Sequence, residues 1–353
     1  MRACPVCGAR YDGDLRLCPL DRAPLGPVVD PLAGRRVGAY RLVEKIGQGG
    51  LSAVYRAHHD ALGRDAAVKI LSPSAAQSPA LRERFLREGR AAHRVRHPCV
   101  VEVHDVGVEG DLVYLVMELI EGETLAAEIA RGPLASARAA AIALQIADAL
   151  AQAHELGVLH RDIKPANVMV LGGGGSRVKL VDFGLAKVRG ELGLTATGAL
   201  CGSPAYLAPE QIDGEAGPAG DLYALGCVIF EMLTGAPPFV GSAAAVLDRH
   251  AGEQAPAPST RAPGVPPWLD AIVVRLLEKA PARRHPSAAA LAADLSRAAG
   301  LPHLDPALLD ALEDLGTKIE ALSAARHGPG GEALEARYRA VVEVARALLP
   351  RLG

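Results

Sequence analysis

The sequence predicts an α+β fold in which a β-rich lobe comes first and an α-rich lobe follows. Short apolar runs with strand-like alternation, separated by turns, fill much of residues 40–118. Beyond Gly122 the pattern becomes mostly helical, with a long alanine- and leucine-rich stretch over 135–156. At 353 residues the chain is long enough for one large two-lobed domain with small appendages.

The small lobe is expected to be a sheet with one intervening helix. Its strands are predicted over 40–46, 53–57, 66–71, 99–108 and 112–118. The helix is predicted over 79–95, where Leu81, Phe85 and Leu86 share one face and charged residues occupy the rest.

Composition divides the chain into four parts. They are a cysteine-rich segment at 1–26, a linker at 27–38, a central domain at 39–300 and a helical tail at 301–353. Within the central domain, the small lobe covers about 39–118 and the large lobe about 122–300.

The tail carries a heptad seam. Its apolar positions are Leu308, Leu312, Leu315, Ile319 and Leu322, and a second such stretch follows a glycine break. This spacing predicts either a helical hairpin packed against the large lobe or a coiled coil that joins two copies into a homodimer.

The overall charge excludes some functions. A net charge of −2 and a pI near 6.6 give no reason to expect general binding to nucleic acid or to an anionic membrane. No apolar run of about 18 residues predicts a membrane span, and the first ten residues lack a signal-peptide core. We therefore expect a cytoplasmic protein with reduced cysteines.

Polar motifs that suit phosphoryl transfer follow the long helix. Phosphoryl transfer needs a group that orients the nucleophile, metal ligands, and a cation on the transferred phosphate. Asp162 could take the first role, Asn167 and Asp182 the second, and Lys164 the third.

A glycine-rich turn in the small lobe adds a phosphate cradle. Gly47, Gly49 and Gly50 lie between two predicted strands, and glycines let backbone N–H groups approach an anion closely. A strand follows the turn, so it is not a dinucleotide fingerprint, and no Gly-Lys-Ser/Thr follows, so it is not a P-loop. Taken alone, the turn could equally be an ordinary hairpin.

Residues 39–300 resemble the bacterial eukaryotic-like protein Ser/Thr kinases. The resemblance rests on motifs in the family's order: the glycine turn, Lys69, Glu88, Met117-Glu118-Leu119-Ile120, His160-Arg161-Asp162, Asn167, Asp182-Phe183-Gly184, Ala208-Pro209-Glu210, Asp221 and Arg284. Lys164, two residues after Asp162, is typical of Ser/Thr-directed rather than Tyr-directed members. The resemblance implies a bilobal protein-kinase fold and protein substrates.

The same resemblance implies ATP and Mg²⁺ as cofactors, with Mn²⁺ as a substitute. Lys69, held by Glu88, would contact the α/β-phosphates, Asn167 and Asp182 would hold the metal, and Asp162 would position the substrate hydroxyl. The residues expected around the nucleotide are Gly47, Gly49, Gly50, Val54, Ala67, Lys69, Met117, Glu118, Ile120 and Met169. Val54, Ala67, Met117 and Met169 could equally be plain core. Ser52 replaces the third loop glycine, which we expect to leave the N–H donors of Gly49 and Gly50 in place.

Arg161 before the catalytic Asp162 implies control by phosphorylation. In kinases with this pair, the arginine is ordered by a phosphate on the activation segment. Thr195 and Thr197 resemble the autophosphorylated pair of bacterial kinases, and Ser203 occupies the position whose hydroxyl bonds the catalytic Asp. The alternative is that both threonines are unmodified loop residues.

Two other functions compete with the kinase. A pseudokinase scaffold would recruit partners through the two ends of the chain, but it usually lacks one of Lys69, Asp162, Asn167 and Asp182. A small-molecule phosphotransferase of the antibiotic-kinase type would not need an activation segment that ends in Ala-Pro-Glu.

The N-terminal segment predicts a structural zinc site. Cys4, Cys7, Cys18 and Asp21 stand in two short Cys-Pro repeats, and so few residues cannot bury a self-sufficient core. The segment resembles a zinc ribbon whose fourth ligand is Asp21. Water or His58/His59 could instead complete the shell, or the segment could be reduced and metal-free. With no strongly basic face, it is expected to bind a protein partner rather than nucleic acid.

Overall fold

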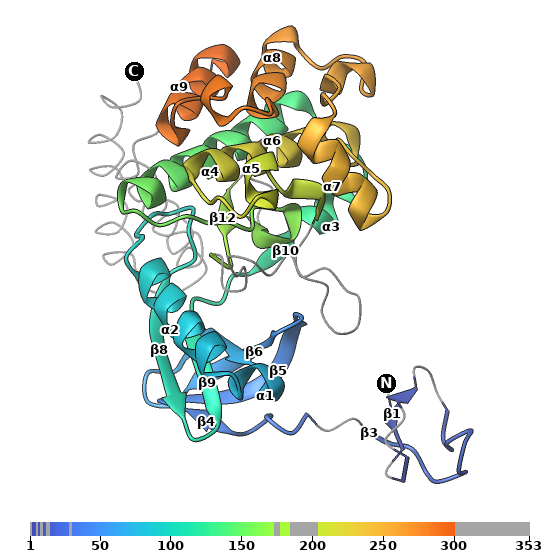
Figure 1. The fold of residues 1–353 in the computed structure, drawn as a ribbon. Helices are drawn as coiled ribbons and strands as arrows, with labels where there is room; N and C mark the ends of the chain where they lie inside the picture. Colours follow the sequence, from blue (N-terminus) through green and yellow to red (C-terminus); the bar gives the residue numbers. More distant parts are fainter. Residues whose placement is uncertain are drawn as a thin grey trace, which may run out of the picture. The chain divides into compact units, whose positions relative to one another are not determined.

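The structure is a computed structural model. It describes residues 2–4, 6–7, 10–11, 15–27, 30–172, 177–183 and 204–300. The chain divides into two compact units, shown in Figure 1: Met1–Arg87 with Val103–Leu119, and Glu88–Glu102 with Ile120–Gly353. The first is rich in strands and the second in helices, which confirms the predicted fold class.

The strand-rich unit is built on a six-stranded antiparallel sheet in the order β4-β5-β6-β7-β9-β8. The strands are β4 (Arg36–Val37), β5 (Tyr40–Gln48), β6 (Ser52–His59), β7 (Arg64–Leu71), β8 (Val103–Glu109) and β9 (Leu112–Met117). Alternate side chains such as Leu42, Tyr55, Val68 and Val116 form its core. Helices α1 (Pro73–Ala76) and α2 (Pro79–His93) follow β7.

The predicted strand at 99–108 begins later than expected. Residues 99–102 are not part of β8, because Val100 makes a bridge with Leu180 of the helical unit and the Val101 N–H donates to the Leu180 carbonyl at 2.9 Å. The other predicted strands and both predicted helices agree with the structure to within a few residues at each end.

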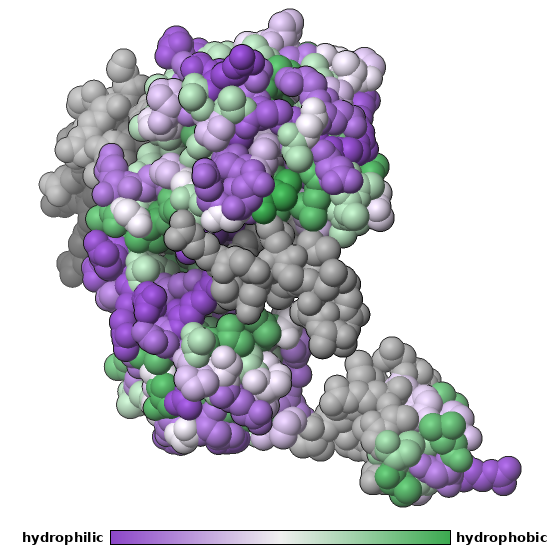
Figure 2. Space-filling view, viewed as in Figure 1, coloured by the Kyte–Doolittle hydropathy of each residue, from purple (hydrophilic) through white to green (hydrophobic). Residues whose placement is uncertain are grey.

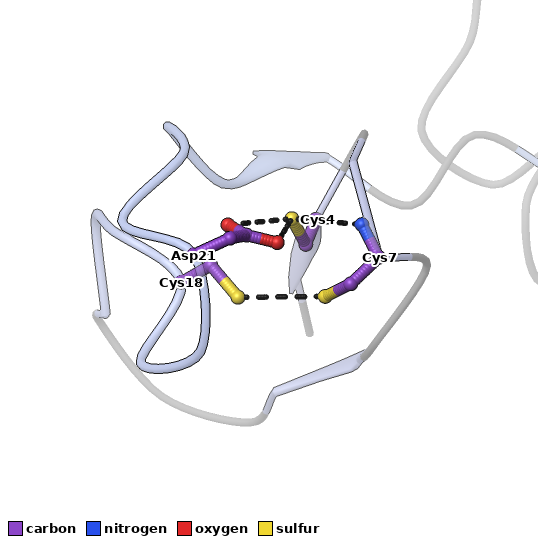
Figure 3. Close-up of side chains that lie close together, drawn as sticks. All are labelled: Cys4, Cys7, Cys18 and Asp21. Atoms are coloured by element: carbon purple, nitrogen blue, oxygen red, sulfur yellow. Dashed lines mark hydrogen bonds between the residues drawn. The ribbon is translucent and has the colours of Figure 1, made fainter.

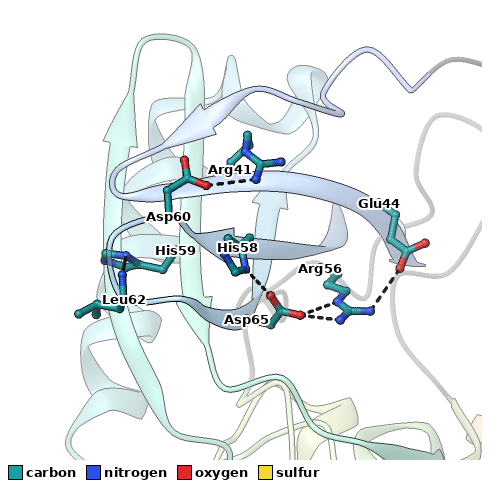
Figure 4. A network of polar contacts seen from close by, with 8 residues as sticks. All are labelled: Arg41, Glu44, Arg56, His58, His59, Asp60, Leu62 and Asp65. Atoms are coloured by element: carbon teal, nitrogen blue, oxygen red, sulfur yellow. Dashed lines mark hydrogen bonds and ion pairs between the residues drawn. The ribbon is translucent and has the colours of Figure 1, made fainter.

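Charged side chains cross between neighbouring strands of this sheet (Figure 4). Asp65 on β7 pairs with His58 Nδ1 at 2.7 Å and with Arg56 Nε at 2.8 Å on β6, and Asp60 accepts from Arg41 at 3.1 Å. These pairs are partly or largely exposed, so each contributes little to stability.

Part of the predicted linker belongs to the small lobe. The Asp30 carboxylate accepts from the Tyr55 hydroxyl at 2.9 Å, pairs with Lys45 Nζ at 3.1 Å and accepts from the Leu32 N–H at 2.9 Å. Val37 is fully buried in the sheet core. Residues from Asp30 onward therefore pack as part of the folded lobe, and only a short connection precedes them.

The helical unit is centred on two largely buried helices, α4 (Ser136–Glu155) and α6 (Pro218–Thr234). Its elements are β10 (Gly122–Thr124), α3 (Leu125–Ile129), α4 (Ser136–Glu155), β11 (Val168–Leu171), β12 (Val178–Leu180), α5 (Pro209–Ile212), α6 (Pro218–Thr234), α7 (Ala243–Gly252), α8 (Pro267–Leu276) and α9 (Ala288–Ala299). A Cβ at Gly226 of α6 would lie 2.8 Å from Leu276 Cβ, so only glycine permits this close packing against α8. None of the described helices has the length and apolar character needed to cross a bilayer.

The N-terminal segment forms a small module of its own. Strands β1 (Arg2–Ala3), β2 (Arg10–Tyr11) and β3 (Gly26–Pro27) pair in the order β2-β1-β3. Its core consists of Cys4, Cys18 and Leu25, with Tyr11 and Ala23 packed beside them. The predicted helical tail at 301–353 lies outside the described residues.

The contacts of Asp30 and Val37 predict where the small lobe begins. A chain that starts at Pro27 should keep the stability of the central domain. A chain that starts at Ala39 should lose about 2 kcal/mol or more of unfolding free energy, because Val37 burial alone is worth about 1.5–3 kcal/mol. Urea unfolding of the two chains measures the difference. Equal midpoints would show that residues 30–38 are a passive linker.

Candidate active site

The loop between α4 and β11 brings together three of the predicted catalytic residues. Lys164 Nζ lies 2.7 Å from Asp162 Oδ2. Asn167 Nδ2 donates to the same carboxylate oxygen at 2.9 Å and to the Asp162 backbone carbonyl at 2.8 Å. The side-chain nitrogen Nδ2 of Asn167 is thus engaged within the loop, and the side-chain oxygen Oδ1 is the atom that could bind a metal. Oxygen is the ligand Mg²⁺ prefers.

Asp182 is tied to this loop through its backbone neighbour. The Val181 N–H donates to the Asn167 carbonyl at 2.9 Å, and His160 Nε2 donates to the Val181 carbonyl at 3.2 Å. Asp182 itself has a φ of 63°, an unusual left-handed conformation for a residue other than glycine. Such strain persists only where the surroundings enforce it, which is typical of a functional site.

Asp221 of α6 binds the backbone of the loop that carries Asp162. Its Oδ2 accepts from the His160 N–H at 2.9 Å and bonds His154 Nε2 at 2.9 Å, and its Oδ1 accepts from the Arg161 N–H at 2.7 Å. Burial opposes ionisation of this carboxylate, but the bonds from His154 and His160 outweigh it and hold the pKa of Asp221 below its usual value. Arg161 also has a φ of 63°, so Asp221 stabilises a strained backbone.

His160 is a neutral structural residue. It is fully buried, and burial lowers the pKa of its imidazole. Its Nδ1 accepts from the Asp162 N–H at 3.3 Å, which fixes the proton on Nε2. Its ring packs against Phe183 with the centroids 4.6 Å apart. His160 therefore couples the Asp162 loop to the segment that carries Asp182.

The predicted pair of Glu210 and Arg284 is present. Arg284 is completely buried and donates to the two carboxylate oxygens of Glu210 at 2.6 and 2.8 Å. Its guanidinium also bonds three backbone carbonyls and lies over the Tyr223 ring. A bidentate pair with every donor engaged fixes the end of the segment that closes at Glu210.

The strand-rich unit holds most of the residues expected around the nucleotide. Lys69, Ala67 and Met117 are buried; in the ladders Lys69 is opposite Val54 on one side and Ala67 is opposite Met117 on the other. Glu118 also belongs to this unit, whereas Glu88, Ile120 and Met169 belong to the helical unit.

The glycine turn differs from our expectation in one respect. The Gly49 N–H donates to the Ser52 carbonyl at 2.7 Å, so this donor closes the β5–β6 turn. We expected the N–H groups of both Gly49 and Gly50 to be available to a phosphate. In this conformation the turn itself uses one of them.

The N-terminal module brings four candidate metal ligands to one point (Figure 3). The ligand atoms of Cys4, Cys7, Cys18 and Asp21 all lie within 4.8 Å of one another. The Cys7 and Cys18 sulfurs are 3.5 Å apart, and Asp21 Oδ2 is 3.1 Å from Cys4 Sγ. Around a tetrahedral zinc with Zn–S bonds of about 2.3 Å, ligand atoms lie roughly 3.5–3.8 Å apart. The spacing fits such an ion.

Backbone N–H groups point at the candidate ligand atoms in both loops. The N–H groups of Val6 and Cys7 point at Cys4 Sγ at 3.3 and 3.4 Å. The Ala23 N–H donates to Asp21 at 2.9 Å, which is the main reason that the pKa of Asp21 falls to about 2. His58 and His59, the alternative ligands, are engaged in the sheet with Asp65 and the Leu62 N–H.

Several predicted residues fall outside the described part of the chain. These are Gly184, the threonines Thr195 and Thr197, and Ser203 of the predicted activation segment. The sequence analysis did not identify His154, which bonds the buried Asp221 beneath the loop that carries Asp162. The only signal for His154 was a histidine at the end of an otherwise apolar helix.

A strand-rich unit followed by a helical unit with an Asp-Lys-Asn loop defines a bilobal, kinase-like fold. Residues 40–295 match the family model described as the protein kinase domain, so the chain belongs to the protein kinase family.

Named relatives are bacterial Ser/Thr protein kinases. PknB of Mycolicibacterium smegmatis is 42% identical over 267 residues, which cover 73% of this chain and 42% of PknB. The chain thus spans less than half the length of the curated relatives it matches. The crystal structure of the Mycobacterium tuberculosis PknI kinase domain superposes with a TM-score of 0.62 at 30% identity, covering 76% of this chain and 99% of that one. Rad53 in complex with AMP-PNP gives 0.62 at 26% identity, over 72% and 64%.

The three bonds to Asp221 predict a stability effect with a defined pH dependence. Asp221→Asn should lower the unfolding free energy by about 3 kcal/mol at neutral pH, because it leaves buried donors without a charged acceptor. The folded pKa of Asp221 is depressed. The ionised carboxylate of Asp221 therefore contributes fully to the free energy of unfolding above the pKa of the unfolded state, about 3.9. This contribution is lost as the pH falls through the lower pKa of the folded state.

Urea unfolding of wild type and Asp221→Asn between pH 7 and pH 3 measures this effect. Asp248→Asn, a change at an exposed position of α7, serves as the control and should be neutral. If the difference in unfolding free energy between wild type and Asp221→Asn stays constant down to pH 3, Asp221 does not stabilise the fold as an ionised carboxylate.

Proposed function

We propose that this chain is an ATP- and Mg²⁺-dependent protein Ser/Thr kinase that also phosphorylates its own activation segment. The observation that carries the proposal is the constellation of Asp162, Lys164 and Asn167 on one rigid loop. Membership of the protein kinase family supports it, as do relatives named Ser/Thr protein kinases. The likeness to a kinase structure that holds AMP-PNP supports a nucleotide site.

Each residue has a distinct role in the proposed reaction. Asp162 accepts a hydrogen bond from the incoming Ser or Thr hydroxyl and orients its oxygen toward the γ-phosphoryl group. Lys164, already 2.7 Å from Asp162, places its positive charge where negative charge develops on that group. Lys69 with Glu88 aligns the α/β-phosphates. Asn167 and Asp182 would hold Mg²⁺, which neutralises phosphate charge when bound.

The loop's rigidity is the chain's own contribution to catalysis. Asn167 holds the Asp162 carboxylate and carbonyl, and Asp221 holds the two N–H groups that precede Asp162. A base that is fixed before substrate arrives loses little entropy on reaction.

Mutation of Asp162 tests the proposed activity. Purified wild type, incubated with labelled ATP, Mg²⁺ and a generic basic protein, should transfer label to that protein and to Thr195 or Thr197. Asp162→Asn should lower the rate by about 10²–10⁴-fold because it removes the hydroxyl-orienting carboxylate. Asp248→Asn, exposed on α7, should match wild type.

Label in neither wild type nor mutant would favour the pseudokinase scaffold. Label retained in Asp162→Asn would show that another residue orients the hydroxyl. Thr197→Ala should slow the kinase if phosphate on this segment orders Arg161. Equal rates for Thr197→Ala and wild type would contradict that control.

We further propose that Cys4, Cys7, Cys18 and Asp21 hold a structural Zn²⁺. The convergence of their ligand atoms and the small core of the module support the site. Recruitment of a protein partner by this module and a homodimer through the tail are proposals from sequence alone. Cytoplasmic placement likewise stays a prediction.

Metal analysis of the purified chain tests the zinc site. We expect one zinc per chain, lost in Cys7→Ser. Asp21→Ala should weaken zinc binding at least about tenfold, or about 1.4 kcal/mol, in competition with a chelator. Asp213→Ala, at an exposed residue after α5, is the control. Unchanged affinity in Asp21→Ala would exclude Asp21 as the fourth ligand.

A further inference from the structure

Three polar side chains meet where α6, α7 and the turn after α8 pack together. They are Tyr223 on α6, His250 on α7 and Lys279 after α8, and all belong to the helical unit. Tyr223 and His250 are fully buried, and Lys279 is half-buried. Hydrophobic and hydrophilic residues are mixed on the visible face around α7 (Figure 2), so buried contacts rather than an apolar patch distinguish this region. The proposed reaction uses none of the three, which we call the α7 anchor.

Lys279 closes the C-terminal end of α7. Its Nζ donates to the His250 carbonyl at 2.9 Å and to the Arg249 carbonyl at 3.3 Å. The last carbonyls of a helix have no partner within the helix, so a cation that donates to them is favourable. Nζ also lies 4.9 Å from the centroid of the Phe239 ring, where the ring attracts a positive charge. The ammonium group of Lys279 therefore holds the end of α7.

The hydroxyl of Tyr223 passes the effect of Lys279 on to His250. Lys279 Nζ donates to Tyr223 Oη at 3.2 Å, and Tyr223 Oη lies 2.8 Å from His250 Nδ1. A protonated lysine can only donate, so the hydroxyl proton is available to His250. Burial raises the pKa of Tyr223 and lowers the pKa of His250 to about 4, so the hydroxyl keeps its proton and the imidazole is neutral at pH 7. The proton of His250 is thus on Nε2.

The His250 ring is the contact through which α7 acts on the short 3₁₀ turn η2 (Pro204–Tyr206). Helix α7 packs against η2, and the backbone of Ala205 interacts with the His250 ring. Nε2 is buried, and within the described ranges it makes no full hydrogen bond. The orientation of the ring therefore depends on the bond between Nδ1 and Tyr223.

The turn η2 lies in the stretch that a protein substrate is expected to meet. It precedes Glu210, at which the predicted activation segment ends. Both η2 and the loop that carries Asp162 rest on α6. Substrate residues next to the reacting hydroxyl follow at about 3.3–3.6 Å each, so they need a surface near that loop. The position of η2 on α6 makes it suitable as part of this surface.

We propose that Lys279 is a positioning residue for the protein substrate, because through Tyr223 and His250 it holds η2 in place. The inference rests on the kinase activity proposed above. The charge of Lys279 then sets the affinity for the protein substrate. The affinity for ATP is independent of it, since the α7 anchor contains none of the residues expected around the nucleotide.

The charge of Lys279 changes near neutral pH. Burial lowers the pKa of Lys279 to about 8, so its ammonium form prevails at pH 7 and its neutral amine at pH 9. A neutral amine can accept the Tyr223 proton, which takes the bond away from His250. Burial raises the pKa of the Cys227 thiol and of the Tyr223 hydroxyl, so neither ionises in this range. The titratable and charged groups that face Lys279 are Tyr223 and Cys227 on α6, Arg249, His250 and Glu253 on α7, and Glu278 and Arg284 on its own turn.

Steady-state kinetics of the full chain between pH 7 and pH 9 test the proposal. With a generic basic protein as substrate, Lys279→Met at pH 7 should raise the KM for that protein at least about fivefold and leave the KM for ATP unchanged. The protein KM of wild type should rise by a similar factor from pH 7 to pH 9. Lys279→Arg, which stays charged, should show no such rise. Arg283→Met removes an exposed cation from the same turn and should behave as wild type.

Two kinetic results would overturn the proposal. An equal rise of the protein KM with pH in Lys279→Arg would assign the titration to another group. An equal change of both KM values in Lys279→Met would show a general structural role. The comparison of wild type with Lys279→Arg remains decisive if Lys279→Met does not fold.

Amide hydrogen exchange at pH 7 tests the positioning without any activity. The Glu253 N–H donates to the same Arg249 carbonyl as Lys279, at 2.9 Å, and the Leu207 N–H donates to the Pro204 carbonyl at 3.2 Å. Both amides should exchange at least about tenfold faster in Lys279→Met and at the wild-type rate in Arg283→Met. Unchanged exchange in Lys279→Met would contradict the positioning alone. Absence of label transfer by wild type would instead contradict the kinase activity and, with it, the role in substrate binding.

Discussion

The buried carboxylate of Asp221 is the constraint on which the candidate active site depends. It is almost fully buried, it stays ionised because His154 and two backbone N–H groups stabilise its charge, and it fixes a backbone with positive φ at Arg161. Asp162, Lys164 and Asn167 are arranged on the loop that this anchor holds. The bonds to Asp221 offset the cost of burying its charge in α6, and they fix the loop that carries Asp162.

A second buried interaction, the ion pair of Arg284 with Glu210, holds the residues at which the predicted activation segment ends. Arg284 and Glu210 join the turn after α8 to the start of α5, and Arg284 also covers the Tyr223 ring on α6. Because Asp221 and Tyr223 lie two residues apart on α6, one buried helix supports both anchors. A substitution in α6 is therefore expected to affect the loop and the segment together.

Motif order and spacing in the sequence indicate Asp162, Lys164 and Asn167, and the structure brings these three residues together on one loop. Asp162, Asn167 and Asp182 could be found from motif spacing, and Glu210 with Arg284 was predicted as a pair. Other features depend on tertiary contacts. His154 bonds Asp221 only because the fold packs α4 against α6, and the Gly49 N–H is engaged because β5 and β6 close a tight turn. The start of the small lobe at Asp30 was missed because a proline- and glycine-containing run resembles a linker until its packing is known.

The attachment of Asp30 to the sheet has a mechanical consequence. Asp30 is secured to Tyr55 and Lys45, and β3 of the N-terminal module ends at Pro27. Three residues of chain extend at most about 11 Å. The module is therefore tethered to the small lobe by a connection of at most this length, and any partner that it binds is kept close to the small lobe. A longer connection would increase the distance that such a partner can reach without changing any contact at either end.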